Sequence, residues 1–319
     1  MTHTNLYPFK TRPYTHQMEA WERSHVKEEF ALFMDMGTGK SKVILDNAAY
    51  LYDHGRIDSV LIVAPKGTYH NWTRNEIPTH LPDHIITTQA IWAAVPKKKE
   101  AEQLERVLQS SNNLRILVMN IEAFSTPKGT KFAMRFLRCT SHTMMVVDES
   151  TTIKNPKAQR TKNVTRVGVQ AKYRRILTGE PVTRSPLDLY SQFCFLNPHL
   201  LGFSSYYTFR NRYSIMIDMK RGTRAFKKVV GYKRLDELGK QIKPWSYRIK
   251  KEQCLDLPPK VYQYREVELT IAQAKVYKEL SDIAVANLDG KVLSVDSVLT
   301  QLLRLHQVTC GHYTADDGE

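Results

Sequence analysis

The segment from Asp35 to Ser41 carries the residue types that bind phosphate groups. It follows an apolar run typical of a strand and precedes a helix-like stretch, so backbone amides and a helix N-terminus would face one point. Lys40 would neutralise the β- and γ-phosphates of ATP, and the Ser41 hydroxyl would coordinate Mg²⁺. A structural turn is the alternative, because Met34 replaces the first glycine of the usual spacing. The nucleotide-binding residues predicted here are Gly37, Thr38, Gly39, Lys40 and Ser41.

A second candidate group is the acidic pair Asp148 and Glu149, which directly follows the apolar run 144–147. Ligands of open α/β sheets bind at the carboxyl ends of the strands, so this pair would lie beside a bound phosphate. Asp148 would hold Mg²⁺ through its water shell, while Glu149 would orient and deprotonate the water that attacks the γ-phosphate. An acidic strand end is common by itself. Together with the loop at Lys40, it predicts an ATP site in which Lys40, Asp148 and Glu149 are catalytic.

The loop at Lys40 and the acidic pair can meet if a parallel sheet covered by helices carries them both. The sequence from Tyr14 to Pro198 predicts such a sheet. Short aliphatic runs alternate there with helix-like stretches, as expected for buried parallel strands. The predicted strands are Phe30–Met34, Ser59–Ala64, Leu114–Met119, Met144–Val147 and Arg175–Thr178. The predicted helices are Ser41–Tyr52, Lys97–Gln109, Pro156–Val167 and Pro186–Leu196. We therefore expect an α/β fold of the P-loop NTPase type.

The rest of the chain is expected to form two further parts. Residues 199–260 are basic and rich in aromatic residues without a clean periodicity, and we predict an appended basic helical segment and linker there. Strand-like alternation returns over Val261–Leu269, followed by predicted helices over Ile271–Leu288 and Val295–Val308. The expected organisation is an ATP-binding lobe over 1–198, the insertion and linker over 199–260, and an incomplete second lobe over 261–319. The last part has only about 60 residues, fewer than such a domain normally needs.

The chain of 319 residues is strongly basic, because 47 lysines and arginines against 32 aspartates and glutamates give a net charge of +15. Such an excess is typical of proteins that bind nucleic acid, although it can also serve solubility alone. No segment approaches the roughly 20 apolar residues that cross a bilayer, and the four cysteines form no Cys-x-x-Cys pair. We therefore expect a soluble monomer that binds DNA and no membrane. The expected location is a reducing cytoplasm, in a bacterial or phage-infected cell.

Several segments resemble the superfamily-two helicase-like ATPases, and among them the Swi/Snf type of DNA translocase. Gln17, which follows Tyr14-Thr15-His16, is similar to the glutamine that reads adenine in this family. The box from Asp148 to Asn155 is similar to the family's Asp-Glu-x-His box with its Ile-Lys-Asn tail. The segment 177–181 resembles the motif that couples hydrolysis to DNA, and Leu-Pro-Pro-Lys at 257–260 resembles the connection between two lobes.

The resemblance implies a RecA-like lobe that uses ATP and Mg²⁺ and contacts the backbone of duplex DNA. The residues implied in nucleic-acid binding are Lys66, Asn120, Thr178 and Arg184. It also implies weak hydrolysis by these residues alone, since the later motifs of lobe two, including an arginine finger, are missing from them.

Some features leave alternatives open. Ser150-Thr151 and Glu180 depart from the family's pattern, so the details of coupling are not implied. His306, Cys310 and His312 include metal-binding residue types, but the family uses this stretch for packing. The alternative functions are a nucleotide-switched nucleic-acid-binding module without motor activity and an RNA- or DNA-unwinding helicase of the same superfamily.

Overall fold

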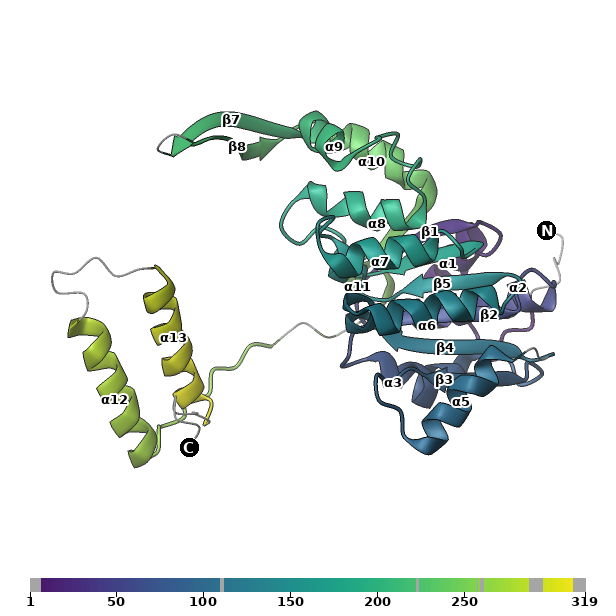
Figure 1. Cartoon of the computed structure of the whole chain (residues 1–319), viewed down its shortest axis with the longest axis horizontal. Coiled ribbons are helices and arrows are strands. Elements are labelled where there is room, and N and C mark those ends of the chain that lie inside the picture. The colour runs from purple at the N-terminus through teal and green to yellow at the C-terminus, as the bar shows by residue number, and fades with distance from the viewer. Residues whose placement is uncertain are drawn as a thin grey trace. The chain divides into compact units, whose positions relative to one another are not determined.

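Figure 1 shows the computed structural model, in which residues 7–109, 112–221, 224–256, 258, 261–286 and 295–311 are described. The chain divides into two compact units, Met1–Leu257 and Pro258–Glu319. The first unit holds a large sheet, its covering helices and a separate β-hairpin. Within its described residues, the second unit holds two helices. No helix of the described ranges is long and apolar enough to cross a membrane.

The described part of the first unit is centred on a seven-stranded parallel sheet with strand order β3-β4-β2-β5-β6-β1-β9. Its strands are β1 (Glu29–Met34), β2 (Ser59–Ala64), β3 (Thr87–Ile91), β4 (Leu114–Asn120), β5 (Thr143–Val147), β6 (Tyr173–Leu177) and β9 (Ser246–Ile249). β1, β2 and β5 are buried along their whole length, as strands covered on both faces must be. Because the strands run the same way, their carboxyl ends share one edge.

Helices cover both faces of this sheet and bury its side chains in two apolar clusters (Figure 1). One face, toward which Phe30 and Leu32 point, carries α1 (Thr15–Ser24), α2 (Lys40–Asp53), α3 (Tyr69–Asn71), a π-helical turn (Trp72–Glu76) and α4 (Ile77–His80). The other face, toward which Ala31 and Phe33 point, carries α5 (Lys98–Leu108), α6 (Pro127–Arg138), α7 (Gln159–Gly168) and α8 (Leu189–Leu196). This division follows from the two-residue repeat of strand side chains.

The expected α/β fold is confirmed, and all five predicted strands are present with bounds shifted by at most two residues. The four predicted helices are present as well, although the α-helices expected from Pro156 and Pro186 begin at Gln159 and Leu189. β3 and β9 are absent from the prediction. β3 is half-exposed and polar at three of its five positions, and β9 has only four residues, so neither contains a long aliphatic run. β9 pairs with β1, so part of the predicted linker belongs to the sheet.

Residues 199–257 depart from the predicted helical segment. α9 (Tyr206–Tyr213) and α10 (Leu235–Ile242) are helices, but β7 (Ser214–Arg221) and β8 (Arg224–Tyr232) form an antiparallel hairpin between them (Figure 1). The helical prediction is wrong for this hairpin because apolar side chains recur there at every second residue, as in Ile215, Ile217 and Met219. That period is typical of a strand.

In the second unit, α12 (Ile271–Ala286) and α13 (Val295–Thr309) lie side by side, and Gln273 Nε2 donates a hydrogen bond to Val308 O at 3.0 Å. The strand predicted over Val261–Leu269 is wrong, because these residues have no regular secondary structure and Tyr264 is fully exposed. Alternating residues form a strand only where a partner satisfies their backbone groups. The predicted helix Ile271–Leu288 extends to residues 287 and 288, which lie outside the described ranges.

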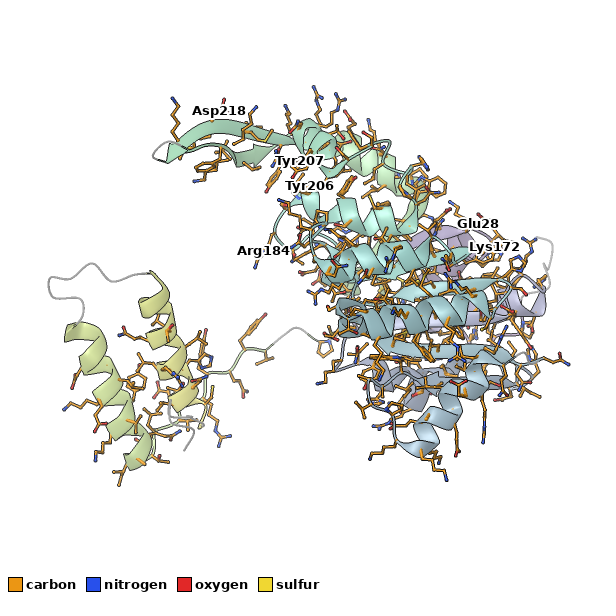
Figure 2. The ribbon with its side chains drawn as sticks, in the orientation of Figure 1. Glu28, Lys172, Arg184, Tyr206, Tyr207 and Asp218 are labelled. Atoms are coloured by element: carbon orange, nitrogen blue, oxygen red, sulfur yellow. The ribbon has the colours of Figure 1, made fainter. Side chains whose placement is uncertain are left out.

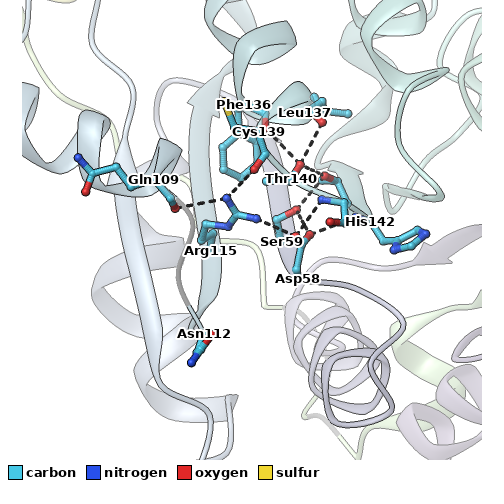
Figure 3. Close-up of polar contacts among 12 residues, drawn as sticks. Asp58, Ser59, Gln109, Asn112, Arg115, Phe136, Leu137, Cys139, Thr140 and His142 are labelled. Atoms are coloured by element: carbon cyan, nitrogen blue, oxygen red, sulfur yellow. Dashed lines mark hydrogen bonds and ion pairs between the residues drawn. The ribbon is translucent and has the colours of Figure 1, made fainter.

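The amino edge of the sheet is held by a polar network around Arg115 (Figure 3). Its guanidinium donates to Asp58 Oδ2 at 2.7 Å and to Cys139 O at 2.8 Å, which joins β4 to the residues before β2 and after α6. Asp58 also accepts the amides of Ser141 and His142 at 2.8 and 3.2 Å. Burial opposes ionisation of Asp58, but these amides and Arg115 together lower its pKa below the usual value. This edge is therefore structural.

Candidate active site

The carboxyl edge of the sheet brings the predicted catalytic residues together. β5, β6, β1 and β9 are consecutive in the sheet, so the loops that follow them are neighbours. β1 leads into residues 35–41, here named the phosphate loop, and β5 leads into Asp148 and Glu149. After β6, Gly179 lies against the phosphate loop, because a Cβ atom at this position would be only 3.4 Å from Asp35 Cα. The turns after three adjacent strands therefore meet at one place.

The phosphate loop depends on two glycines and one buried lysine. Gly37 and Gly39 have φ angles of 83° and 87°, a region that side chains with a Cβ rarely adopt. The loop turns through them into α2. Lys40, in the first turn of this helix, is 9% exposed, and its Nζ donates to Met34 O at 2.9 Å and to Asp35 O at 3.2 Å. The ammonium therefore contacts carbonyl groups of the same loop that would bind a phosphate.

Helix α1 supports the phosphate loop from the side. Gln17 Nε2 donates to Thr38 O at 3.1 Å, and Gln17 Oε1 accepts the amide of Tyr14 at 3.0 Å. The imidazole Nε2 of His16 also lies 2.9 Å from Thr38 O. A Cβ atom at Gly39 would overlap the Gln17 amide. Gln17 thus packs on the loop, and adenine recognition by Gln17 stays a prediction, whereas the role of His16 was missed from the sequence.

Asp148 is held in place by two donors. Trp72 Nε1 donates to Asp148 Oδ2 at 3.2 Å, and the amide of Glu149 donates to Asp148 Oδ1 at 3.0 Å. Burial raises the pKa of Asp148 to about 6, although the hydrogen bond from Trp72 opposes this shift. Trp72 is buried, and its indole N–H orients a predicted metal ligand.

Glu149 adopts a backbone conformation that is rare for a residue with a side chain, with φ 46° and ψ 61°. Its carboxylate accepts a hydrogen bond from Thr178 Oγ1 at 3.4 Å. Burial lowers the pKa of Lys40, whereas the charges of Glu149, Asp148 and Asp35 raise it. The charges of both predicted carboxylates therefore act on the pKa of the predicted catalytic lysine.

The four residues predicted to bind nucleic acid fall into two groups. Lys66 and Arg184 are exposed, and Figure 2 labels Arg184 on the loop between β6 and α8. Thr178 is only 1% exposed, and its hydroxyl lies between the Glu149 carboxylate and the amide of Glu180. Asn120 Oδ1 accepts the amide of Ala123 at 2.8 Å and so caps a short helical turn.

Hydrogen bonds also connect the acidic pair with the loop that carries Arg184. Ser150 Oγ donates to Gln192 Oε1 at 2.6 Å, and Gln192 Nε2 donates to Pro181 O at 2.8 Å. Within the same loop, Asp188 Oδ2 accepts the amide of Arg184 at 2.9 Å. Ser150 and Gln192 are fully buried, so this connection is shielded from water. Ser150, which departs from the family's pattern, therefore has a structural partner in this chain.

The structure adds Lys251, which the sequence did not single out. Its backbone amide donates to Asp35 Oδ2 at 2.9 Å, and its side chain lies beside Gly37. Lys251 reaches the site because β9 pairs with β1 and places its own carboxyl end next to the phosphate loop. Lys251 is far from the phosphate loop in the sequence, so only the pairing of β9 with β1 shows that they are neighbours.

A glycine-rich phosphate loop at the start of a helix and an acidic pair on a nearby parallel strand define a RecA-like nucleotide-binding lobe. The chain belongs to the SNF2-related domain family, whose pattern matches residues 17–314. This match confirms the resemblance that the motifs indicated.

Individual relatives agree with this family. ATP-dependent helicase FUN30 of Saccharomyces cerevisiae is 25% identical over 249 residues, which are 76% of this chain and 21% of that protein. TATA-binding protein-associated factor MOT1 of the same yeast is 34% identical over 148 residues, which are 46% of this chain and 8% of that protein. The chain therefore spans less than a quarter of either relative.

A solved structure supports the same fold. The Sulfolobus solfataricus SWI2/SNF2 ATPase core in complex with dsDNA is similar with a TM-score of 0.59 and 23% identity. The match covers 97% of this chain and 60% of that one.

Proposed function

We propose that this chain is the ATP-binding part of a DNA-stimulated ATPase that translocates on or remodels duplex DNA. The observation that carries the proposal is the meeting of Lys40, Asp148 and Glu149 at one edge of the sheet, where both carboxylates act on the pKa of the lysine. A lysine on a glycine-rich loop and a neighbouring acidic pair are the groups that phosphoryl transfer from ATP requires. Membership of the SNF2-related domain family supports the same reaction.

The residues present fit an ATP–Mg²⁺ complex. Asp148 offers a carboxylate that two donors already orient, and hard oxygen ligands of this kind suit Mg²⁺. Ser41 and Asp148 would hold the ion, which neutralises phosphate charge when bound. The amides of the loop and Lys40 would bind the phosphates, and Gln17 would read the adenine. Glu149, fixed by its backbone and by Thr178, would orient and deprotonate the attacking water.

DNA is proposed as the partner that stimulates hydrolysis. Lys66 and Arg184 are exposed cations that can contact phosphates, and the net charge of +15 favours a polyanion. Thr178 is too buried for easy contact with DNA, so we assign it to coupling through Glu149. Asn120 would act through the turn that it caps, or through its remaining hydrogen-bonding groups. The related archaeal core was solved with dsDNA, which supports the choice of duplex.

The test is ATP binding and hydrolysis with and without duplex DNA. Lys40→Ala should abolish ATP binding measured by calorimetry while the thermal unfolding of the chain stays unchanged. Glu149→Gln should bind ATP normally but lower the hydrolysis rate by a factor of about 10² or more. ATP binding by Lys40→Ala that equals the wild type would contradict the assignment of the phosphate loop.

Strand unwinding is the second candidate, because the relative FUN30 bears the name helicase. Strand-displacement assays on duplex DNA and on RNA separate it from translocation, which needs no unwinding. A nucleotide-switched binding module predicts instead that ATP changes DNA affinity but is not turned over.

A further inference from the structure

Lys251 covers one side of the phosphate loop. Its Nζ and Cε lie 3.5 and 3.8 Å from the position that a Cβ atom on Gly37 would occupy. Two backbone contacts fix the chain here, since the Lys251 amide donates to Asp35 Oδ2 at 2.9 Å and the Asp35 amide donates to Ile249 O at 3.2 Å. The end of β9 and the start of α11 (Lys251–Cys254) are therefore attached to the loop at Ile249 and at the backbone of Lys251 itself.

The negative charges around the loop favour a second cation beside Lys40. Asp35, Asp148 and Glu149 bring three carboxylates to Lys40, whose ammonium already donates to loop carbonyls. A triphosphate adds further negative charge, and charge-assisted hydrogen bonds from ammonium groups stabilise bound phosphate. In the described residues, the ammonium of Lys251 makes no ion pair. It is therefore available to a ligand on the loop.

We propose that Lys251 is a second phosphate-binding lysine, which contacts the phosphates of ATP held on the loop by Lys40. This inference rests on the proposed nucleotide site. Lys251 also lies in the short stretch through which the first unit continues toward residue 258. Occupancy of the phosphate site is thereby linked to the segment that leads to the second unit, because the same residue contacts the phosphates and begins that segment.

The test compares nucleotide binding by the whole chain and by Lys251→Met. Methionine keeps much of the aliphatic length and the backbone N–H that donates to Asp35, so only the ammonium is removed. Lys243→Met is the matched control, since Lys243 is an exposed lysine just before β9. Calorimetric titrations use ATP, ADP and AMP in the presence of Mg²⁺, and thermal unfolding without nucleotide checks that each variant is folded.

We expect Lys251→Met to bind ATP about tenfold more weakly or worse, as for the loss of one hydrogen bond to a charged group. ADP binding should weaken as well, AMP binding should change little, and Lys243→Met should match the wild type. Lys251→Arg should retain most of the affinity, because it keeps the charge. Unchanged ATP affinity in Lys251→Met would overturn the inference, as would an equal loss for ATP and AMP. A wild-type chain that does not bind ATP would instead refute the nucleotide site itself.

The link to the connecting segment has a separate readout. Hydrogen exchange of the amides at 250–256 should slow when ATP binds the wild type, because the lysine at their start becomes fixed. The same amides should respond less in Lys251→Met at nucleotide concentrations that saturate both proteins. An equal response in the two proteins would show that Lys251 does not transmit occupancy of the phosphate site.

Discussion

Buried charge controls the site at the scale of single residues. Burial raises the pKa of Asp148 to about 6, and the hydrogen bond from Trp72 limits this shift. Because the pKa in the folded state exceeds the ordinary value of 3.8, ionisation of Asp148 destabilises the fold. The free energy of unfolding should therefore decrease as pH rises from about 4 to about 6, and change no further from this cause above that range. A bound cation would reverse the penalty, since it favours the ionised carboxylate.

Binding of Mg²⁺ should depend on pH in a way that Asp148 and Trp72 determine. Below pH 6 protons compete with the metal for Asp148, so the affinity of the ATP complex for Mg²⁺ should fall. Trp72→Phe removes the donor that lowers this pKa. In this variant, the midpoint of the pH dependence of Mg²⁺ binding should shift to higher pH. Titrations from pH 5 to 7.5 measure both effects, with Asp148→Asn reporting the titration of the nucleotide itself. The same pH profile in wild type and Asp148→Asn would contradict this role.

At the scale of elements, helix α1 is anchored by Arg175. This fully buried guanidinium donates to the carbonyl oxygens of Ser24 and Lys27 at 2.9 and 2.6 Å, and to Glu28 O at 2.9 Å. These carbonyls belong to the end of α1 and the turn into β1, while Arg175 itself lies on β6. The helix that carries Gln17 is thus fixed to the sheet by one side-chain bond to its last carbonyl and by two more to the turn that follows it.

Removing this anchor should destabilise the first unit. Arg175→Met leaves several buried carbonyls without a donor, and we expect a loss of about 2–4 kcal/mol in the free energy of unfolding. Arg135→Met is the control, because its ion pair with Glu105 is more than half exposed and such pairs contribute at most about 1 kcal/mol. Urea unfolding measures both variants. Equal stabilities would show that solvent or another donor replaces the guanidinium.

The hairpin of β7 and β8 is a second element with a functional prediction. Lys220, Lys227 and Lys228 are exposed on it, and the register pairs Lys228 with Ile217 on one face. Figure 2 shows side chains projecting from the hairpin near Asp218. A two-stranded ribbon with cations and exposed apolar groups suits the groove and phosphates of a duplex.

Replacing these three lysines of the hairpin by alanine should weaken duplex DNA binding and its salt dependence. Each lost phosphate contact lowers the slope of log K against log salt by about 0.9. The matched control replaces Lys97, Lys98 and Lys99, an exposed run at the start of α5, and removes the same charge. Fluorescence anisotropy over a range of salt concentrations measures the slopes. If the two triple variants lose the same slope, the hairpin has no special role in DNA binding.

At the scale of the whole molecule, the prediction concerns catalytic competence. The chain matches 60% of the archaeal ATPase core. Phosphoryl transfer in related systems gains about three to five powers of ten from an arginine finger. We expect these 319 residues to bind ATP and DNA but to hydrolyse ATP slowly, as measured by phosphate release with and without duplex. Rapid DNA-stimulated turnover would contradict this expectation.

Much of the fold could be predicted because the central strands are uninterrupted aliphatic runs. β2, with Ser59–Ala64, is buried at every position, and its bounds follow directly from its composition. β3 and β9 are not predicted because they are edge strands, which need less apolar surface. The hairpin is not predicted because basic residues interrupt the apolar alternation along its strands. The strand predicted over Val261–Leu269 shows the alternation of a strand but is not one, since it has no pairing strand in the described residues.

The sequence alone determined the chemical groups of the candidate site, because the order of glycine, lysine and acidic residues is local and is read along the chain. Lys40, Asp148 and Glu149 were found in this way. Only the tertiary structure decided which distant groups hold them, since strand pairing brings together residues far apart in sequence. The indole of Trp72 on Asp148 and the side chain of Lys251 beside Gly37 are such contacts. Neither leaves a periodic pattern, because each depends on the order of strands in the sheet.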